Sequence, residues 1–325
     1  MNLAIVGAGM IVNDFFNVVN DLPEIKLKAI VGTTTDLEKM KIFQEKFNIE
    51  NVYLDIDECL NNTEIDTVYI GVPNYLHYSI AKKALEMKKN VICEKPFTLK
   101  LSQAKELKAL ALKNDVVLFE AITNHYLSNY QALKECVSEI GDIRIIQCNT
   151  SHYSSRYTLF REGTTLPVFN PKMGGGALMD VNIYNIHFVV GLLGKPKKVS
   201  YLANVEKGID TSGVLIMEYD NTKVVCVGAK DSTVYAPTFI QGNKGVITIS
   251  SPINSLESFE KSIISQESQT INVNLHAHRM YEEFKIFNEA IEKHDMEYVK
   301  KQLNHSIDVM EVVELALADA NIHLG

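Results

Sequence analysis

Short apolar runs alternate with amphipathic stretches through the first 120 residues, and this alternation restricts the fold more than any other feature. The apolar runs read as buried strands and are Leu3–Val6, Leu27–Val31, Asn51–Leu54, Thr67–Ile70, Asn90–Cys93 and Val116–Phe119. Helix-like segments lie between several of them, at Leu37–Phe47, Tyr75–Met87 and Ser102–Lys113. Strands that alternate with helices of this length form a parallel, doubly wound sheet. We therefore expect a Rossmann domain of the α/β class, with a parallel doubly wound sheet, over residues 1–120.

The pattern changes from about residue 121 onward. Helices are expected over Asn129–Val137 and Gly176–Leu193, and later over His278–His294 and Met296–Ala320. Six strand-like runs follow one another without helices between them, at Lys198–Val205, Ser212–Tyr219, Lys223–Ala229, Phe239–Gln241, Gly245–Ile249 and Ser258–Ser265. Such a succession favours antiparallel pairing. Residues 121–325 are therefore predicted to form a C-terminal α+β domain with a largely antiparallel open sheet.

Composition excludes several classes of partner. The 325 residues are 46% hydrophobic and 22% charged, and the formal net charge is −8. A mildly acidic chain is poorly suited to bind nucleic acid or an anionic membrane through bulk charge. The five cysteines include no C-x-x-C pair, which favours a reducing compartment. No apolar run reaches the roughly 18 residues that span a bilayer. We expect a cytoplasmic protein without membrane or nucleic-acid partners.

A glycine-rich turn follows the first predicted strand. Gly7 and Gly9 stand between Leu3–Val6 and a helix-like stretch that begins at Met10 and Ile11. In a dinucleotide fold the first glycine makes the tight turn, the second admits the pyrophosphate, and the following N–H groups face the anion. The third glycine position is filled by Val12, whose branched side chain must be accommodated. In this context the turn predicts a dinucleotide site, with a purely structural turn as the alternative.

The end of the second strand bears on the choice between NAD and NADP. NAD enzymes usually carry an acidic residue there for the ribose 2′-hydroxyl. This chain has Thr33, Thr34 and Thr35 instead, with Asp36 later and Lys39 as the nearest cation. We predict an NAD(P) cofactor, with NADP favoured. The alternative is that the threonines only cap the next helix.

Glu94, Lys95 and Pro96 follow the fifth predicted strand. Ligands of doubly wound sheets bind outside the carboxyl ends of the strands, so a lysine here is placed to hydrogen-bond a substrate oxygen. Three glycines, Gly174–Gly176, open a later helix that carries Asp180, Tyr184 and His187 at i, i+4 and i+7. Lys95, Asp180 and Tyr184 are the predicted catalytic residues. Asp180 would orient the reacting hydroxyl and Tyr184 would act as general acid or base. His187 is interpreted as a core histidine.

These motifs together resemble the Gfo/Idh/MocA oxidoreductase family along the whole chain. The glycine turn, the E-K-P sequence, and the G-G-x-x-x-D-x-x-x-H/Y helix of that family all have counterparts here. The resemblance implies that Pro73, Asn74 and His77 line the nicotinamide side. It also implies reversible oxidation of a hydroxyl in a small sugar, polyol or diol. Tyr184, where many members have histidine, is similar to the branch with glucose–fructose oxidoreductase and dimeric dihydrodiol dehydrogenase, many of which favour NADP.

Other implications of the resemblance concern assembly and alternatives. The resemblance implies that residues 121–325 form a substrate-binding and oligomerisation domain, whose sheet pairs with another subunit to give a homodimer or homotetramer. A non-catalytic dinucleotide sensor and a glycoside-cleaving enzyme that oxidises its substrate transiently use the same fold. Retention of Lys95, Asp180 and Tyr184 argues against the sensor. His276 and His278 lack the spacing of a metal site, and none is expected. The sequence does not identify the substrate.

Overall fold

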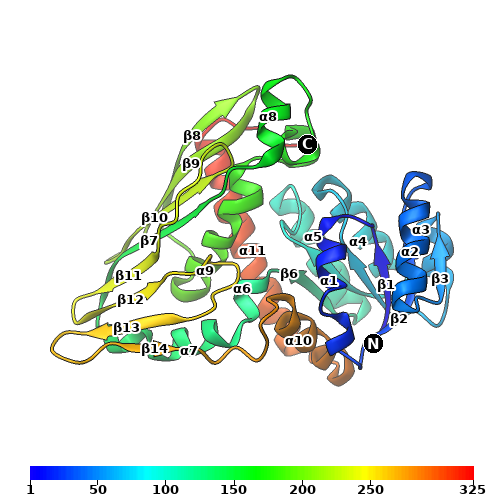
Figure 1. Cartoon of the computed structure of the whole chain (residues 1–325), viewed down its shortest axis with the longest axis horizontal. Helices are drawn as coiled ribbons and strands as arrows, with labels where there is room; N and C mark the ends of the chain where they lie inside the picture. The colour runs from blue at the N-terminus through cyan, green and yellow to red at the C-terminus, as the bar shows by residue number, and fades with distance from the viewer. The chain divides into compact units, whose positions relative to one another are not determined.

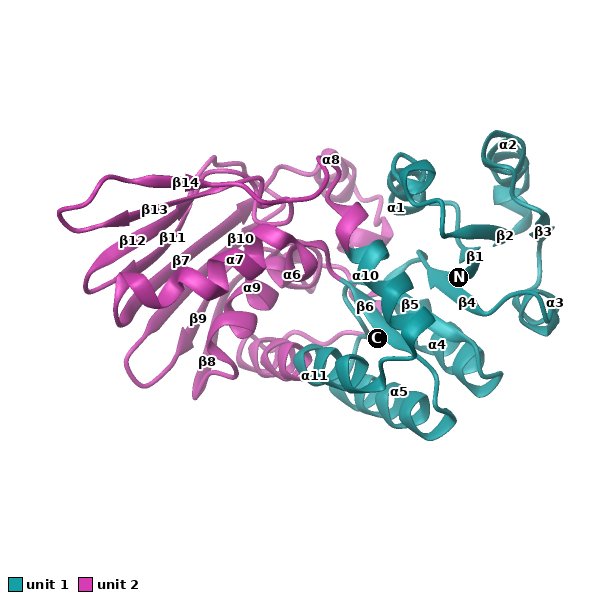
Figure 2. Ribbon diagram, turned by 90° about the horizontal axis from the view of Figure 1, so that it is seen from below, with its two compact units in different colours: residues 1–121, 283–307 teal, residues 122–282, 308–325 magenta.

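The computed structural model describes all 325 residues and divides them into two compact units (Figures 1 and 2). Unit 1 comprises Met1–Ala121 and Glu283–Ile307, and unit 2 comprises Ile122–Glu282 and Asp308–Gly325. The return of residues 283–307 to the first unit has no counterpart in the sequence pattern, because helices of both units share the same apolar periodicity.

Unit 1 is built on a six-stranded sheet in the order β3-β2-β1-β4-β5-β6. All its pairings are parallel, which confirms the expected Rossmann arrangement. Its strands are β1 (Asn2–Val6), β2 (Lys26–Val31), β3 (Asn51–Tyr53), β4 (Thr67–Ile70), β5 (Asn90–Glu94) and β6 (Leu118–Ala121). Its helices are α1 (Met10–Phe15), α2 (Leu37–Phe47), α3 (Ile56–Asn61), α4 (His77–Glu86), α5 (Leu101–Asn114) and most of α10 (Met280–Lys293), with 3-10 turns η1 (Val19–Asp21), η2 (Thr34–Asp36) and η3 (Asn74–Leu76).

Aromatic packing explains why the segment from Glu283 belongs to unit 1. The ring of Phe284 lies 4.3 Å from that of Phe15 and 5.0 Å from that of Tyr69. Phe287 stacks on Phe119 of β6 at 4.7 Å. Each of these side chains is fully buried, so α10 closes the core of the sheet. Burying a side chain of this size stabilises the fold by about 1.5 to 3 kcal/mol.

Unit 2 is built on an eight-stranded sheet in the order β14-β13-β12-β11-β7-β10-β9-β8. Its strands are β7 (Ile143–Ser151), β8 (Lys198–Glu206), β9 (Ile209–Glu218), β10 (Lys223–Ala229), β11 (Thr238–Gly242), β12 (Gly245–Ile249), β13 (Phe259–Ile263) and β14 (Gln269–Ile271). All its pairings are antiparallel except that of β7 with β10, which is parallel. The expected, largely antiparallel sheet is confirmed.

The central strand β7 is absent from the sequence prediction. Only Ile146 and Cys148 of this strand point into the core and are buried. Arg144 and Gln147 interrupt the apolar residues of the strand, so no continuous apolar run marks it. Its place between β10 and β11 supplies partners on both sides that the local sequence does not reveal.

The helices of unit 2 lie along one face of its sheet (Figure 1). They are α6 (Thr123–Tyr126), α7 (Ser128–Cys136), α8 (Ser155–Arg161), α9 (Ile183–Leu193) and the later part of α11 (Met296–Asp319), whose earlier part belongs to unit 1. The short turns are η4 (Val137–Ile140), η5 (Pro167–Phe169), η6 (Pro171–Met173) and the π-helical η7 (Leu178–Asn182). The stretch Pro171–Leu193 is long and apolar enough to cross a membrane, yet 72% of it is buried, as in the core helix of a soluble domain.

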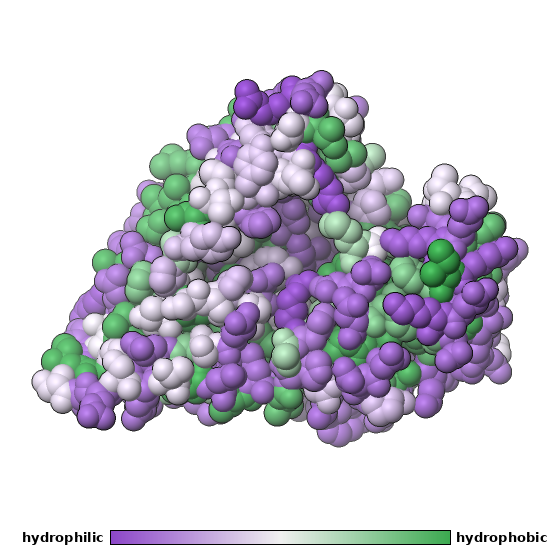
Figure 3. Space-filling view, in the orientation of Figure 1, coloured by the Kyte–Doolittle hydropathy of each residue, from purple (hydrophilic) through white to green (hydrophobic).

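No element of the chain covers the opposite face of this sheet (Figure 1). Side chains alternate along β9, where Leu215 and Met217 are buried on the helix side and Val214 and Ile216 are not. Figure 3 shows apolar surface interspersed with polar surface along the flank that the sheet occupies in Figure 1.

Candidate functional site

The glycine turn of unit 1 has the geometry of a dinucleotide cradle. Gly7 has a φ of +109°, and a Cβ at this position would lie 2.5 Å from the carbonyl oxygen of Gly71. Both the backbone conformation and the close approach therefore require glycine. At Gly9 an added Cβ would meet only the carbonyl oxygen of Gly71, at the ordinary van der Waals distance of 3.8 Å, so the protein does not crowd this backbone. Gly9 precedes Met10 and Ile11, which begin α1. This open backbone fits a pyrophosphate.

Gly71 compensates for the missing third glycine of the turn. Val12 is fully buried, and a Cβ added to Gly71 would lie 2.8 Å from its Cγ2 atom. Close helix–strand packing normally needs a small residue on the helix. Here the small residue stands after β4, and the branched residue stands on the helix. The departure from the motif is therefore accommodated within the same contact.

Thr33 and Asp36 form a capping box at the start of η2. The Asp36 carboxylate accepts from the Thr33 backbone N–H at 3.1 Å and from its hydroxyl at 2.6 Å. The carboxylate of Asp36 thus lies closer to the end of β2 than its sequence position suggests. Thr34 is the first residue of η2. Lys39 extends from α2 and donates to the carbonyl oxygen of Ala8 at 2.5 Å. The ammonium group of Lys39 therefore lies at the glycine turn.

His77 connects the loops that follow two neighbouring strands. Its Nδ1 lies 2.9 Å from the carbonyl oxygen of Pro96, and its Nε2 lies 2.9 Å from that of Val72. The side chain is fully buried, and burial lowers its pKa, to which the nearby Lys95 charge adds. His77 thus holds the loops after β4 and β5 together. Pro73 and Asn74 follow directly in the first of these loops, where Asn74 begins η3.

The E-K-P sequence lies at the carboxyl end of β5. Glu94 is buried and accepts from the hydroxyl of Tyr69 at 2.7 Å. Lys95 follows it half-buried, and the Lys95–Pro96 peptide is cis. Glu120 of β6, which pairs with Cys93 of β5, is buried and accepts from the backbone N–H of Phe97 at 3.0 Å. Glu120 is not among the residues predicted from the sequence. It follows the apolar run Val116–Phe119 directly, and a charged residue at the end of a predicted strand is also what indicates Lys95.

The glycines of unit 2 make room for a buried acid. Gly176 has a φ of +105°, and a Cβ there would lie 2.1 Å from Oδ1 of Asp210. Oδ2 of Asp210 accepts from the backbone N–H of Leu178 at 2.6 Å and from the hydroxyl of Tyr201 at 2.7 Å. Burial raises the pKa of Asp210, and these hydrogen bonds oppose that rise. Gly176 is thus required so that Asp210 can reach the first turn of the helix.

Asp180 and Tyr184 lie on two different kinds of helix. Asp180 is in the π-helical turn η7, and Tyr184 is in the first turn of α9. The predicted shared face of Asp180 and Tyr184 presumes a regular α-helix, whereas a π turn contains more residues per turn. Such turns occur frequently at functional sites. Tyr184 is largely buried, with its carbonyl oxygen bound by the side chain of Asn124 at 3.0 Å.

Two asparagines fix this helix on the sheet. Asn182 donates to the carbonyl oxygen of Cys226 at 3.2 Å, and Asn185 donates to that of Val227 at 3.1 Å. Asn185 also accepts from the hydroxyl of Thr150 at 2.9 Å. Both asparagines are fully buried, so these bonds satisfy groups that would otherwise be costly to bury. His187, one turn later, is also fully buried.

Asp180 forms an ion pair that the sequence reading did not anticipate. Nζ of Lys230 lies 2.7 Å from Oδ2 of Asp180. Lys230 is the first residue after β10, and its side chain is almost completely buried. The sequence indicates Lys230 only by its position, as a charged residue directly after an apolar strand. The structure groups no three His, Cys, Asp or Glu residues in a way that would hold a metal ion.

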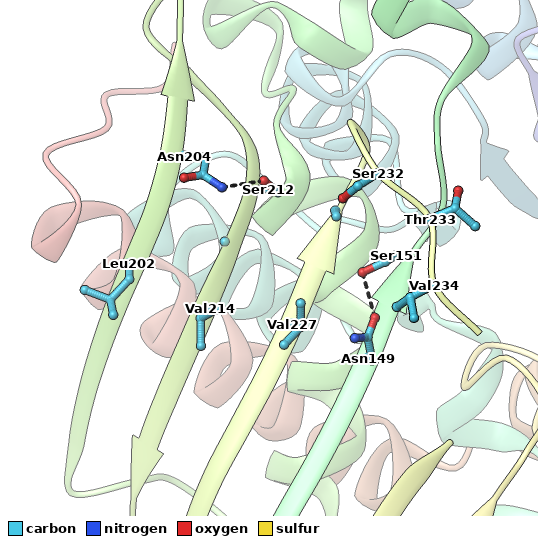
Figure 4. A pocket seen from close by; sticks show the side chains of 12 residues that line it. Asn149, Ser151, Leu202, Asn204, Ser212, Val214, Val227, Ser232, Thr233 and Val234 are labelled. Atoms are coloured by element: carbon cyan, nitrogen blue, oxygen red, sulfur yellow. Dashed lines mark hydrogen bonds between the residues drawn. The ribbon is translucent and has the colours of Figure 1, made fainter. Parts of the chain in front are cut away.

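A hollow of about 470 Å³ lies on the uncovered face of the unit 2 sheet (Figure 4). Leu202, Val214, Val227 and Asn149 form one cross-strand row within it. Its polar groups bind one another, since Asn204 donates to Ser212 at 2.9 Å and Ser151 donates to Asn149 at 2.6 Å. None of the predicted catalytic residues lines this hollow.

Comparison with known proteins gives matches to both units. A model of the oxidoreductase family with an NAD-binding Rossmann fold, GFO_IDH_MocA, matches residues 1–122, and the model of the C-terminal domain of that family matches residues 130–248. The scyllo-inositol 2-dehydrogenase (NADP(+)) of Bacillus subtilis is 36% identical over 252 residues, which cover 77% of this chain and 76% of that protein. The trans-1,2-dihydrobenzene-1,2-diol dehydrogenase of Xenopus laevis is 31% identical over 76% of this chain and 74% of its own length.

A solved structure shares the fold over nearly the whole chain. It is a 3-ketoreductase from Actinomadura kijaniata in complex with NADP and TDP-benzene, with a TM-score of 0.85. The alignment covers 98% of this chain and 97% of that one at 18% sequence identity.

Proposed function

This chain belongs to the Gfo/Idh/MocA family of NAD(P)-dependent oxidoreductases, and from that premise we propose that it is an NADP-dependent dehydrogenase or reductase of a small sugar, polyol or diol. The observation that carries the proposal is the glycine turn, in which Gly7 is required by its backbone and no protein atom lies closer than 3.8 Å to a Cβ added at Gly9. The family membership and the dehydrogenase relatives, which act on CH–OH groups, give the reaction class.

The cofactor preference is argued from the end of β2. Lys39 brings a positive charge to the glycine turn, where it can pair with a phosphate. The carboxylate of Asp36 is already engaged by both donors of Thr33. The Asp36 carboxylate is therefore less available to bind a ribose hydroxyl than the carboxylate of a typical NAD site, which has no such internal partners. The relative from Bacillus subtilis is named as an NADP(+) enzyme.

The chemistry is divided among three residues of this chain. When bound, the nicotinamide supplies or accepts a hydride at its C4 atom. We assign to Lys95 a hydrogen bond to the reacting oxygen of the substrate. Asp180 orients the substrate by accepting a hydrogen bond from a second hydroxyl, because the single proton of the reacting hydroxyl is the one that Tyr184 exchanges. Tyr184 exchanges the hydroxyl proton as general acid or base.

Fluorescence titration with NADPH, and separately with NADH, tests the cofactor part of this proposal. We expect both to bind, with NADPH the tighter ligand. Preference for NADH would keep the reaction class and overturn the argument from Lys39 and Asp36. Binding of neither would contradict the proposed function. Binding without turnover of any sugar, polyol or diol would favour a dinucleotide sensor instead.

We also propose a homo-oligomer formed through the uncovered face of the unit 2 sheet. Leu202, Val214 and Val227 form an apolar row there, and Leu202 is 64% exposed. Paired apolar faces of this kind are typical of subunit interfaces. Light scattering should give a dimer or tetramer mass, and Val227→Lys should dissociate it. A wild-type mass of 36.5 kDa, that of one chain, would contradict the assembly.

The cytoplasmic location and the absence of membrane and nucleic-acid partners remain predictions. The five cysteines are all free thiols, which supports a reducing compartment. Fractionation of cells that express the tagged protein would test the location, with recovery in the membrane fraction as the contradicting result.

A further inference from the structure

The ion pair between Lys230 and Asp180 is strongly asymmetric in its exposure to solvent. The side chain of Lys230 is 3% exposed, whereas that of Asp180 is 31% exposed. Their contact, at 2.7 Å between Nζ and Oδ2, is short enough for a charge-assisted hydrogen bond. Lys230 therefore contacts the carboxylate of Asp180 from the buried side, and its own ammonium group is not accessible to a ligand.

The backbone of Lys230 is held on both sides, which fixes where its side chain begins. Its N–H donates to the carbonyl oxygen of Thr211 at 2.8 Å, and its carbonyl oxygen accepts from the N–H of Ser154 at 2.8 Å. These bonds extend the pairing of β10 with β9 and with the chain that follows β7. The side chain thus starts from a rigid strand end, as precise positioning of a functional group requires.

The ammonium group of Lys230 also has uncharged partners inside the unit. Besides Asp180, Nζ donates to the carbonyl oxygen of Val168 at 2.7 Å and lies 4.5 Å from the centre of the Phe169 ring. A buried ammonium group without such partners would be costly, so the charge is retained only because they are present. Of these groups, Asp180 alone carries a charge.

A second carboxylate, that of Asp210, also lies near Lys230, and its charge interacts with that of the lysine. Its Oδ2 is bound by Tyr201 and by the N–H of Leu178, and no hydrogen bond joins it to Lys230. Asp210 therefore stabilises the start of the helix that carries Asp180, while Lys230 contacts Asp180 directly.

We propose that Lys230 is a positioning residue for the reaction, whose buried ammonium group holds Asp180 ionised and fixes the direction of its carboxylate toward the substrate hydroxyl. One oxygen of the carboxylate is occupied by the lysine, which removes the freedom of the side chain to rotate. A fixed acceptor contributes more to the rate than a mobile one, since small misplacements of reacting groups are costly. The inference relies on the proposed function, because it presumes that Asp180 contacts substrate.

A kinetic double-mutant cycle tests this assignment in the full-length protein. The variants are Asp180→Asn, Lys230→Met and the double mutant, with Lys261→Met as the matched control. Lys261 is also largely buried, in β13 of the same unit, and pairs with Glu139 at 2.7 Å. Lys230→Met should lower kcat roughly 10- to 100-fold and leave NADPH affinity unchanged. The double mutant should be no slower than Asp180→Asn alone, because both changes remove one interaction.

The outcomes separate this inference from the proposed function. Full activity of Asp180→Asn would contradict the role of Asp180 itself. A large loss in Asp180→Asn with kcat of Lys230→Met within about twofold of wild type, or with losses that multiply in the double mutant, would overturn the role of Lys230 alone. An equal loss in Lys261→Met would indicate a general effect of deleting buried lysines, and would also overturn it.

A second variant separates charge from anchoring and applies even where Lys230→Met does not fold. Lys230→Gln is neutral but retains a donor for the carbonyl oxygen of Val168. We expect its kcat to fall as in Lys230→Met. Activity near that of wild type in the glutamine variant would show that Lys230 only anchors the loop at Val168, which contradicts the proposal.

Discussion

The two glycine-led motifs of this chain differ in what holds their functional residues. In unit 1, Gly7, Lys95 and His77 are positioned by strand ends and by backbone groups of adjacent loops. In unit 2, Asp180 stands in a π turn whose partners come from remote segments, with Lys230 after β10 and Asp210 in β9. Parallel strands place their ends at one edge by topology alone, whereas a helix start in an α+β unit needs dedicated side chains. The difference indicates that strand topology positions the residues of unit 1, whereas contacts between side chains remote in sequence position those of unit 2.

The largest expected effect concerns the proposed acid or base of unit 2. Tyr184→Phe should lower kcat about 10²- to 10⁴-fold, the usual contribution of general acid–base catalysis. NADPH affinity should not change, because the cradle is untouched. Steady-state kinetics and fluorescence titration measure the two quantities. Tyr130→Phe is the control, since Tyr130 is a buried tyrosine that binds the carbonyl oxygen of Phe188 in the same helix. An equal loss of kcat in Tyr184→Phe and Tyr130→Phe would contradict a specific catalytic role for Tyr184.

The cradle of unit 1 is tested by a pair of glycine substitutions. Gly7→Ala should destabilise the protein by about 2 to 4 kcal/mol, because the new Cβ adds a steric clash to an unfavourable φ. Gly9→Ala should change stability little, because its Cβ would meet the protein only at van der Waals distance, but it should weaken NADPH binding by placing a methyl group where the pyrophosphate approaches the backbone. Thermal unfolding and titration distinguish the two effects. Loss of stability in Gly9→Ala equal to that in Gly7→Ala would contradict the assignment of an uncrowded backbone to Gly9.

The exchanged packing of Val12 and Gly71 predicts a smaller, compensating effect. Gly71→Ala should cost about 1 to 3 kcal/mol through overpacking against Val12. The same change in a Val12→Ala background should cost much less, because the Cγ2 atom that it meets is gone. Urea denaturation of the four proteins gives the coupling energy. Additive costs would show that Gly71 is needed for another reason.

The smallest predicted effect concerns cofactor choice. Lys39→Met should weaken NADPH binding about 3- to 10-fold and NADH binding less, because Lys39 is a partly exposed cation placed for a phosphate. Asp36→Asn should favour NADPH further by removing a negative charge near Thr33. Ratios of the two dissociation constants measure both. Equal weakening of both cofactors in Lys39→Met would mean that the lysine only supports the turn through Ala8.

The sequence predicts unit 1 better than unit 2 for physical reasons that particular residues illustrate. The helix Leu37–Phe47 and the strand Thr67–Ile70 are predicted at their observed bounds, because the pattern of buried residues in each is visible in its own sequence. Strand β7 was missed because its order in the sheet depends on partners distant in sequence. Asp180 was recognised as functional from its motif. Lys230, which lies fifty residues later, becomes significant only when the fold brings it to 2.7 Å from Asp180.

The most direct test of the account is turnover by the purified protein with NADP⁺ and a panel of inositols, dihydrodiols and sugars, followed as formation of reduced nicotinamide. The account predicts turnover of at least one polyol or diol with NADP⁺. It also predicts that Lys95→Met and Tyr184→Phe each abolish most of that turnover while the protein stays folded and still binds NADPH. Turnover that survives both substitutions would contradict the assignment of the reaction to these residues.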